Sequence, residues 1–532
     1  MINHGLGDWI HRRRVRMADR PALFSTAGDL TYGELASRID RLAQALAERG
    51  VRPGDRVAYL GENAPSVLEC LFAAGSLGAV FVPLNTRLAP PELAFQLQDS
   101  GARTLVCSAE LGRQGLVSCP DTPVERVLIV GEETVPAELE DLADEQLGAE
   151  VSARPVLEAY EPVLASGADE RPQVPVAQED LAVILYTSGT TGRPKGAMLS
   201  HGNLHWNALN VITDYDITSR DVALMISPLF HVAALSQGTL PVLLKGGAVI
   251  LETRFDPGRA LRLIREHGVT NMSGVPTTYQ MLCEHPDWES TDLSSLRTLT
   301  CGGSAVPARV LDAYENRGMA FTMGYGLTET APGATMLPPS HSRAKQGSAG
   351  LPHFHTDVRV VRPDGERCAP GEVGEILVQG PHVVSGYWNR PDATAAALDE
   401  TGEGTWLHTG DMGRLDDEGF LYVTDRLKDM IISGGENIYR HRWSRRSRSS
   451  TPSPRWRSSG SRMTAGARCP APSSWSAKAT RSRRRRSSST CRADSPATRS
   501  PSQWCSSRRC RAPPPGRSAS PPCASCTPDP IH

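Results

Sequence analysis

The 532 residues of this chain are too many for one compact core, so at least two domains are expected. The total formal charge of −2 conceals two unlike parts, because residues 1–439 carry 36 Lys and Arg against 57 Asp and Glu, whereas residues 440–532 carry 21 against 2. The acidic first part argues against a nucleic-acid-binding surface, and its six cysteines are too scattered for a zinc site or a disulfide framework.

The first residues predict a protein of the cytoplasm. A polar, basic segment, "DWIHRRRVRM", occurs near the N-terminus, and no apolar signal core follows it. The longest uncharged run, residues 70–86, contains glycines and a proline and is short for a membrane span, so a buried helix, a turn and a strand are expected there. Arg12, Arg13, Arg14 and Arg16 indicate a solvated helix face, with weak contact to anionic lipid as the alternative.

In chain order, helical and strand patterns alternate over residues 22–106, which predicts βαβ units. "YGELASRIDRLAQALAERG" has the 3.6-residue apolar period of a helix, and "DRVAYLG" has the content of a short strand. Residues 131–180 have a weak apolar periodicity and are expected to form an exposed segment outside the core, before the next core strand. Core strands resume at "LAVILYT", "GAVIL", "SLRTLTCGG" and "AFTMGYG". Residues 350–423 have the short strands and turns of a distorted antiparallel β region, so the expected fold class is α/β, a large domain of several subdomains.

The motif "YTSGTTGRPKG", residues 186–196, has the composition of a loop that binds a polyphosphate. It lies between two strand-like runs. Glycines permit close backbone approach, hydroxyl groups donate hydrogen bonds and a lysine supplies a positive charge. The residues concerned are Thr187, Ser188, Gly189, Thr190, Thr191, Gly192, Lys195 and Gly196. No Ser or Thr follows Lys195, so this is not the P-loop of NTPases. A flexible Ser/Gly surface turn is the alternative.

Together with "YGLTET", residues 325–330, this motif resembles the adenylate-forming superfamily of acyl-CoA synthetases, luciferases and peptide-synthetase adenylation domains. The resemblance covers nearly all of residues 1–439. It implies that the loop binds the β- and γ-phosphates of ATP, that Tyr325 stacks on adenine and that Thr328 meets phosphate. It also implies that Glu329 binds Mg²⁺, a role that suits a hard carboxylate oxygen.

Three shorter segments extend the resemblance. "TGD", residues 409–411, implies that Asp411 binds the ribose hydroxyls. "DRLKDMIISGGENIY" resembles the hinge and the opening of a small α+β C-terminal domain, with Arg426 at the ribose and Lys428 as the pivot. "CGGS" implies that Gly302 and Gly303 lie beside adenine, although a plain strand-end turn is an equal alternative. The implied domains are a large AMP-binding domain, residues 1–425, and a hinge with the first residues of the C-terminal domain, residues 426–439.

The resemblance also implies a reaction. A carboxylate attacks the α-phosphate of ATP to give acyl-AMP and pyrophosphate, and the thiol of coenzyme A then displaces AMP. His231, in "PLFHVAAL", lies near the acyl group in the family, and a structural histidine is the alternative. The segments expected around the acid are small and apolar, so an apolar acid is favoured, and the relatives that the chain most resembles are bacterial fatty-acyl-CoA synthetases. The oligomeric state is left open.

The last 93 residues, 440–532, differ from everything before them. They contain no Leu, Val, Phe, Tyr or Glu, and Arg, Ser and Pro make up 56 of them. Such a segment cannot bury enough apolar surface to offset its ordering entropy, so it is expected to be disordered. The chain as written then lacks the C-terminal domain and its adenylation lysine, and its turnover is expected to be greatly reduced.

A shift of reading frame in the DNA accounts for this tail. "RMTAGAR" can be encoded so that another frame reads Asp-Asp-Arg-Trp-Gly-Glu, "PPPGRS" can conceal Ala-Thr-Gly-Lys-Val, and "RHRWS" can conceal Pro-Pro-Val-Glu, all phrases of the family in one frame and in order. Three alternatives stay open: an Arg/Ser-rich RNA-binding tail, a zinc module at Cys505, Cys510, Cys523 and Cys526, and a nucleotide sensor without catalysis.

Overall fold

The computed structural model describes residues 3–131, 133–147, 154–187, 193–302, 306–402, 404–426, 430–433 and 436–439. Residues 145–147, 425–426, 430–433 and 436–439 are described as backbone only. All of them belong to one compact unit, Met1–Pro452, and a second unit, Ser453–His532, contains none of them. The predicted disordered tail therefore lies outside the described residues.

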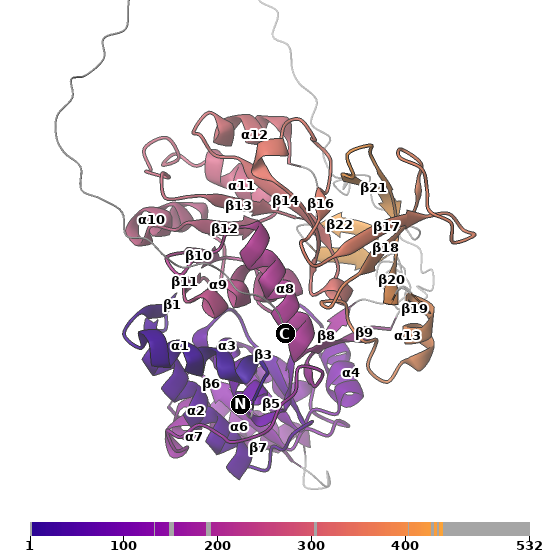
Figure 1. The fold of residues 1–532 in the computed structure, drawn as a ribbon. Coiled ribbons are helices and arrows are strands. Elements are labelled where there is room, and N and C mark those ends of the chain that lie inside the picture. Colours follow the sequence, from indigo (N-terminus) through magenta and orange to yellow (C-terminus); the bar gives the residue numbers. More distant parts are fainter. Residues whose placement is uncertain are drawn as a thin grey trace, which may run out of the picture. The chain divides into compact units, whose positions relative to one another are not determined.

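A seven-stranded sheet is built from the chain up to and including Ser200 (Figure 1). Six strands are parallel in the order β7-β6-β5-β3-β4-β8, and β9 joins β8 in the antiparallel direction. The strands are β3 (Arg56–Leu60), β4 (Val80–Pro83), β5 (Thr104–Ser108), β6 (Arg126–Val130), β7 (Val156–Ala159), β8 (Leu181–Thr187) and β9 (Lys195–Ser200). The helices of this part are α2 (Tyr32–Glu48), α3 (Pro65–Leu77), α4 (Pro90–Ser100), η2 (Ala109–Leu111), α5 (Gly112–Val117), α6 (Ala137–Leu147) and α7 (Tyr160–Ser166).

A nine-stranded sheet carries several of the predicted site residues. Its order is β16-β15-β14-β13-β12-β10-β11-β1-β2, parallel from β14 to β1, with β15, β16 and β2 antiparallel to their neighbours. The strands are β1 (Pro21–Ser25), β2 (Leu30–Thr31), β10 (Val222–Met225), β11 (Ala248–Leu251), β12 (Asn271–Gly274), β13 (Thr298–Cys301), β14 (Phe321–Gly326), β15 (Gly333–Leu337) and β16 (Leu351–Pro352). The helices are η1 (Leu6–Asp8), α1 (Trp9–Met17), α8 (His201–Asp214), η3 (Ala233–Thr239), α9 (Leu240–Lys245), α10 (Pro257–His267), α11 (Pro276–Cys283), α12 (Ala308–Glu315), η4 (Thr328–Thr330) and η5 (Pro339–His341).

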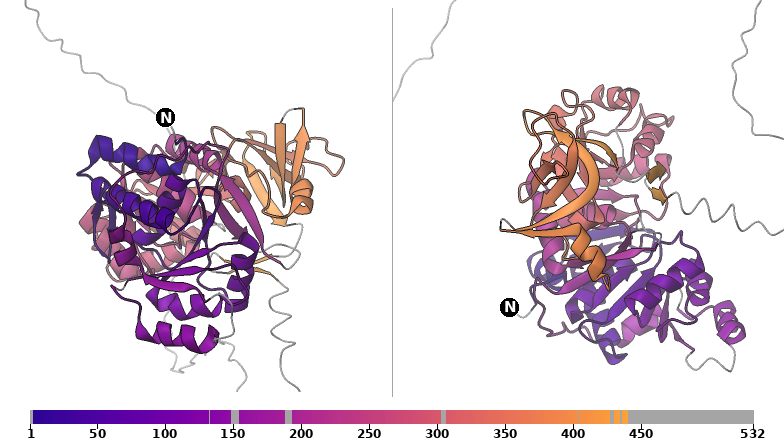
Figure 2. Two further views of the ribbon diagram at one scale, coloured as in Figure 1. Left: turned by 90° about the horizontal axis from the view of Figure 1, so that it is seen from below. Right: turned by 90° about the vertical axis from the view of Figure 1, so that its right-hand side faces the viewer.

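The third sheet is wholly antiparallel, which confirms the prediction for residues 350–423. Figure 2 shows it in orange. The order is β17-β18-β20-β19, with β21 on β20. Its elements are β17 (Asp357–Val361), β18 (Gly374–Gln379), α13 (Pro391–Ala397), β19 (Leu398–Thr401), β20 (Gly404–Leu415) and β21 (Leu421–Arg426). Beyond it, β22 (Met430–Ser433) and β23 (Glu436–Tyr439) form an antiparallel pair.

Local sequence signals account for the predicted helices. The Thr31 side chain accepts a hydrogen bond from the Glu34 backbone N–H, and the Glu34 carboxylate accepts from the Thr31 N–H, so a capping box begins α2. The uncharged run folds as predicted: α3 is buried throughout, Gly78 ends it with φ of +66°, and β4 follows. Across the described ranges, none of the helices combines the length and apolar content that a bilayer crossing needs.

The expectation for residues 131–180 is wrong in part. This stretch contains β7, the edge strand of the seven-stranded sheet, and α7, which packs on α2. Tyr160 of α7 is fully buried, and its hydroxyl donates to the buried carboxylate of Glu69 at 2.6 Å. β7 and α7 are only four and seven residues long, too short to show a clear periodicity, and tertiary contacts stabilise them instead.

Two buried histidines predict a loss of stability in acid. Burial lowers the pKa of the His201 imidazole to about 4 and that of His382 to about 3. In the unfolded chain both pKa values return to roughly 6.5, so below that pH the unfolded state binds protons that the folded state does not. Stability is therefore present above pH 6.5 and falls as the pH drops towards 4, by roughly 3 kcal/mol for His201.

The measurement is the urea midpoint of unfolding at pH 7, 5.5 and 4.5. The variant His201→Gln cannot titrate and is expected to lose less stability than the parent over this interval. His4, an exposed residue before η1, provides the control substitution His4→Gln. A parent and a His201→Gln variant with the same pH dependence contradict the prediction.

Candidate active site

The predicted polyphosphate loop connects two adjacent antiparallel strands, β8 and β9. Thr187 lies opposite Lys195 in this pair, and the Thr187 hydroxyl donates to the Lys195 carbonyl at 3.4 Å. The predicted flanking strands are therefore confirmed. Ser188, Gly189, Thr190, Thr191 and Gly192 lie outside the described residues. The strand pair brings the two ends of the loop side by side, with Lys195 at the second end.

Lys195 and Glu329 both contact Tyr387, a residue for which the sequence predicts no role. The Tyr387 hydroxyl donates to Oε1 of Glu329 at 2.7 Å, and the Lys195 ammonium lies 4.9 Å from the centre of the Tyr387 ring. Glu329 belongs to the short helix η4, which Thr328 begins, and both residues are half-buried. The structure therefore gathers the predicted phosphate-binding cation and the predicted Mg²⁺ ligand around one tyrosine.

The predicted adenine and ribose residues are also in contact. Tyr325 lies on β14, and its hydroxyl donates to Oδ2 of Asp411 on β20 at 2.8 Å. Asp411 is 2% exposed, so its carboxylate has been withdrawn from bulk water. In the β20-β21 ladder Asp411 pairs with Arg426, whose side chain lies outside the described residues. Residues that are 86 positions apart in the chain thus form one polar pair.

Hydrogen bonds of Thr409 and Gly410, the other two residues of "TGD", fix the backbone around Asp411. Gly410 has φ of +70°, a conformation that favours glycine, and its N–H donates to the Glu375 carboxylate at 3.2 Å. The Thr409 hydroxyl accepts from the Asp411 N–H at 3.1 Å and donates to the Ile376 carbonyl at 2.7 Å. "TGD" is therefore an irregular stretch within β20, at a register shift against β18, that presents its aspartate in a defined position.

The positions of Gly302 and His231 give less evidence for their predicted roles. Gly302 follows β13, and its N–H donates to the Gly274 carbonyl at 3.2 Å. Among the described residues other than its chain neighbours, none has a heavy atom within 4 Å of the place that a Cβ would take. Gly302 stands at the carboxyl end of the parallel strand beside β14, where α/β sheets bind ligands; Gly303 lies outside the described residues. His231 precedes η3 and lies against the Phe230 ring at 4.6 Å, so its predicted role at the acyl group stays a prediction.

A polar pair, Gln237 and Tyr215, lies against β14 next to Tyr325. The Gln237 amide donates to the Tyr215 hydroxyl at 2.8 Å. A Cβ built on Gly324 would lie 3.8 Å from the Tyr215 hydroxyl and 4.0 Å from the Gln237 nitrogen. Burial raises the pKa of the Tyr215 phenol above its usual range, so the hydroxyl stays protonated. The absence of a side chain at 324 thus leaves an amide and a phenol facing the strand that carries Tyr325.

The chemistry of the carboxylate fits Mg²⁺. In the described part of the chain no three His, Cys, Asp or Glu side chains gather as a metal cage. Mg²⁺ is commonly held by one or two carboxylates together with substrate phosphates and water. A single Glu329 near Lys195, the predicted phosphate-binding lysine, is a suitable donor for such a shared site.

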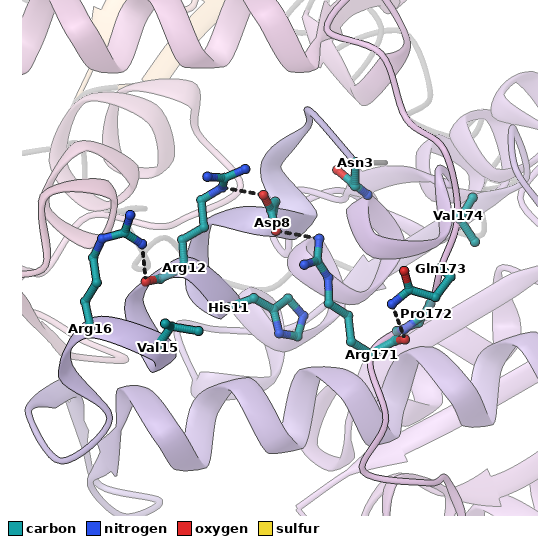
Figure 3. Close-up of a pocket in the computed structure, with 10 residues that line it drawn as sticks. All are labelled: Asn3, Asp8, His11, Arg12, Val15, Arg16, Arg171, Pro172, Gln173 and Val174. Atoms are coloured by element: carbon teal, nitrogen blue, oxygen red, sulfur yellow. Dashed lines mark hydrogen bonds and ion pairs between the residues drawn. The ribbon is translucent and has the colours of Figure 1, made fainter. Parts of the chain in front are cut away.

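The arginines of α1 have partners within the chain. Arg12 and Arg16 line a cavity of about 420 Å³, in which the buried Asp8 carboxylate forms ion pairs with Arg12 and Arg171 (Figure 3). Arg13 donates to the Leu244 carbonyl at 2.7 Å, and Arg14 lies 3.5 Å from Asp40. The predicted solvated face is correct for Arg16 but wrong for the other three, which are half-buried against acceptors that the fold brings to them. Contact with lipid stays a prediction.

Comparison with known proteins identifies the family. A family profile described as AMP-binding enzyme matches residues 10–388. The chain belongs to the AMP-binding enzyme family. It is 49% identical over 440 residues to a feruloyl-CoA synthase of Amycolatopsis sp., covering 82% of both chains. It is 41% identical to an indoleacetate–CoA ligase of Aromatoleum aromaticum, covering 82% of this chain and 81% of the relative. A solved fatty acyl CoA synthetase of Mycobacterium tuberculosis has a TM-score of 0.69 and 32% identity, covering 82% and 81%.

Membership of the AMP-binding family confirms several predictions. The α/β fold with a large N-terminal domain matches solved members of the family. The enzyme class, an AMP-forming acyl-CoA ligase, is confirmed, and acyl-CoA ligases of this family use ATP, Mg²⁺ and CoA. The resemblance to fatty-acyl-CoA synthetases is real, but the feruloyl-CoA synthase is more similar than the solved fatty acyl enzyme.

Three functional candidates escaped the sequence analysis: Tyr387, Gln237 and Tyr215. Tyr387 is in "SGYWNRPDAT", where its neighbours suggest only a turn before a helix. Gln237 is in "HVAALSQGTL", whose small and apolar residues predict only an apolar pocket. For Gln237 the signal in the sequence is a long polar side chain in a segment of mostly small residues.

Proposed function

We propose that the protein joins coenzyme A to an apolar aromatic acid of the hydroxycinnamate class through an acyl-AMP intermediate. The observation that carries this proposal is the 49% identity to a feruloyl-CoA synthase over 82% of both chains. The 41% identity to an indoleacetate–CoA ligase supports an aromatic acid as well. A fatty acid is the second candidate, supported by the likeness to the solved fatty acyl CoA synthetase. A cytoplasmic location is part of the proposal.

The side chains near β14 support an aromatic acid with a polar substituent. Val232, which precedes η3, and Ala234 and Leu235, at the start of η3, are buried apolar residues. Gln237 and Tyr215 add an amide and a phenol that face Gly324. An apolar ring fits beside Val232, Ala234 and Leu235. A phenolic hydroxyl can exchange hydrogen bonds with Gln237 and Tyr215.

The residues have distinct roles in the proposed reaction. Lys195 and the loop backbone bind the triphosphate. Glu329 binds Mg²⁺, and Thr328 contacts phosphate. Mg²⁺ supplies charge stabilisation when it is bound. Tyr325, Gly302 and Asp411 hold the adenosine, with Arg426 at the ribose. The carboxylate of the acid forms a bond to the α-phosphorus as pyrophosphate leaves, and the CoA thiol then forms the thioester as AMP leaves. Catalysis is mainly positioning and electrostatic stabilisation.

The test is acid-dependent pyrophosphate release with ferulate, cinnamate, indoleacetate and dodecanoate. We expect kcat/KM to be highest for ferulate. A preference for dodecanoate contradicts the aromatic assignment, and ATP binding without any acyl-AMP indicates a nucleotide sensor instead. Because the printed chain is expected to turn over slowly, the assay uses both this chain and one with the reading frame restored.

Gln237→Leu is expected to change substrate preference. Losing one hydrogen bond to a phenolic acid should lower the ratio of kcat/KM for ferulate over cinnamate by roughly 10-fold. The measurement is that ratio in parent and variant. Gln280→Leu on α11, where the amide contacts Glu284 at 3.3 Å, is the matched control. An unchanged ratio in Gln237→Leu contradicts this part of the proposal.

We further propose that residues 440–532 are an out-of-frame product. The match to the feruloyl-CoA synthase covers 440 residues, which is close to the length of chain before the composition changes. The basic Arg/Ser-rich composition favours one alternative, a tail that binds RNA. Sequencing the DNA around the Tyr439 codon decides between them, and salt-dependent RNA binding by the full chain supports the alternative.

A further inference from the structure

Tyr387 contacts both the Lys195 ammonium and the Glu329 carboxylate, two opposite charges that the proposed function needs at separate places. Its hydroxyl donates to Glu329 at 2.7 Å, while its ring face attracts the Lys195 ammonium at 4.9 Å. In the described part of the chain Lys195 makes no ion pair. The cation and the carboxylate thus contact different parts of one side chain instead of each other.

The backbone of Tyr387 is attached directly to the strand that carries Lys195. The Trp388 N–H donates to the Gly196 carbonyl at 2.7 Å, and the Met198 N–H donates to the Gly386 carbonyl at 3.0 Å. The Tyr387 N–H donates to the Thr394 hydroxyl at 2.9 Å. Gly386 has φ of +144°, and a Cβ there would lie 2.5 Å from Thr394, so glycine is required at this approach. The tyrosine is therefore held at a fixed distance from β9.

Glu329 is attached to the same segment from its own side. The Val384 N–H donates to the Glu329 carbonyl at 3.0 Å, so η4 and the segment that leads to Tyr387 are joined through their backbones. Without the aromatic spacer, a lysine and a glutamate this close to one tyrosine would attract each other. A direct ion pair would occupy both the charge needed by the triphosphate and the oxygen needed by Mg²⁺.

We infer that Tyr387 is a positioning residue that holds the Lys195 ammonium and the Glu329 carboxylate apart, so that the first stays available to the triphosphate and the second to Mg²⁺. The inference rests on the proposed roles of Lys195 and Glu329. It assigns no contact with substrate to Tyr387 itself. The hydroxyl orients the carboxylate through Oε1, and the ring limits where the ammonium can go.

The experiment separates these two actions with Tyr387→Phe and Tyr387→Leu in the full chain. Phenylalanine keeps the ring and loses the hydrogen bond to a charged group, so the Mg²⁺ concentration for half-maximal ATP binding should rise about 10-fold. Leucine also loses the ring and should raise it further and weaken ATP binding at saturating Mg²⁺. Calorimetric titration of ATP at several Mg²⁺ concentrations measures both effects without turnover.

Tyr160→Phe is the matched control, because it removes another tyrosine-to-carboxylate hydrogen bond, to Glu69 at 2.6 Å, from the core. It should lower the melting temperature and leave the Mg²⁺ requirement unchanged. Tyr387→His, which keeps a flat ring with an N–H donor, should recover part of what Tyr387→Leu loses. Parent-like Mg²⁺ dependence in Tyr387→Phe, or equal values for the Leu and His variants, overturns the inference.

Failure of the proposed function gives a different result. If the chain with the reading frame restored binds Mg·ATP but releases no pyrophosphate with any aromatic acid, the substrate assignment fails, and the Tyr387 variants still report on Mg²⁺. If the parent binds Mg·ATP with no dependence on Lys195 or Glu329, the premise of the inference fails. Substitutions Lys195→Met and Glu329→Gln in the same titration distinguish these cases.

Discussion

Acid-dependent pyrophosphate release is expected to fall by roughly 100- to 1,000-fold when Glu329 is replaced by glutamine. Glutamine has nearly the same shape, and its carbonyl can still accept the Tyr387 hydroxyl. It lacks the negative charge that a hard cation requires. The fold should persist, because the bond from the Val384 N–H to the Glu329 carbonyl involves backbone only. The measurement is the initial rate over a range of Mg²⁺ concentrations.

The control for this substitution is Glu284→Gln. Glu284 caps α11 and pairs with Arg309 at 2.7 Å on the surface, where an ion pair contributes little to stability. Its rate and Mg²⁺ dependence should match those of the parent. A Glu329→Gln variant that retains more than about a tenth of the parent rate, with normal Mg²⁺ dependence, would exclude Glu329 as the metal ligand, since loss of such a group costs far more.

Restoring the reading frame after the Tyr439 codon is expected to raise turnover by roughly 100-fold or more. The restored phrases include a glycine-lysine pair, and a preorganised cation at a reacting phosphate contributes an effect of this size. The printed tail has a single lysine and almost no residues that could build a core around it. Pyrophosphate release from the two chains under identical conditions measures the difference.

A third chain shows which part of the restored domain matters. In it the frame is restored but the lysine of the glycine-lysine pair is replaced by methionine. We expect its rate to fall back towards that of the printed chain while its ATP affinity stays near the restored value. Equal turnover of the printed and restored chains refutes the proposal that the tail is a defect and strengthens the case for a tail with its own function.

Much of the architecture could be predicted from local patterns. The run from Pro65 to Pro83 has helix-forming content, then Gly78, then apolar strand residues, and the structure has α3, a left-handed turn and β4 in that order. The capping box at Thr31 and Glu34 likewise marks the start of α2. Such signals are local, because capping, turn conformation and apolar period depend on residues a few positions apart. The short elements β7 and α7 lack these signals and were missed.

The residues of the candidate site could be predicted from the sequence, but the contacts between them could not. Lys195, Glu329, Tyr325 and Asp411 were each found in short motifs. The contacts between Tyr325 and Asp411, and between Glu329 and Tyr387, join residues 86 and 58 positions apart. No pattern within one segment encodes such pairs, since they depend on how the antiparallel sheet meets the strands β9 and β14.

The family, the α/β class, a candidate phosphate loop and the abrupt change at residue 440 could all be predicted from residue types and short spacings. The assembled fold was needed to find that Tyr387 lies between Lys195 and Glu329, that Tyr215 and Gln237 face Gly324, and that Arg13 of α1 has an internal acceptor. Hydrogen bonds and cation–π contacts act over a few ångströms, so their partners become neighbours only after the sheets have assembled.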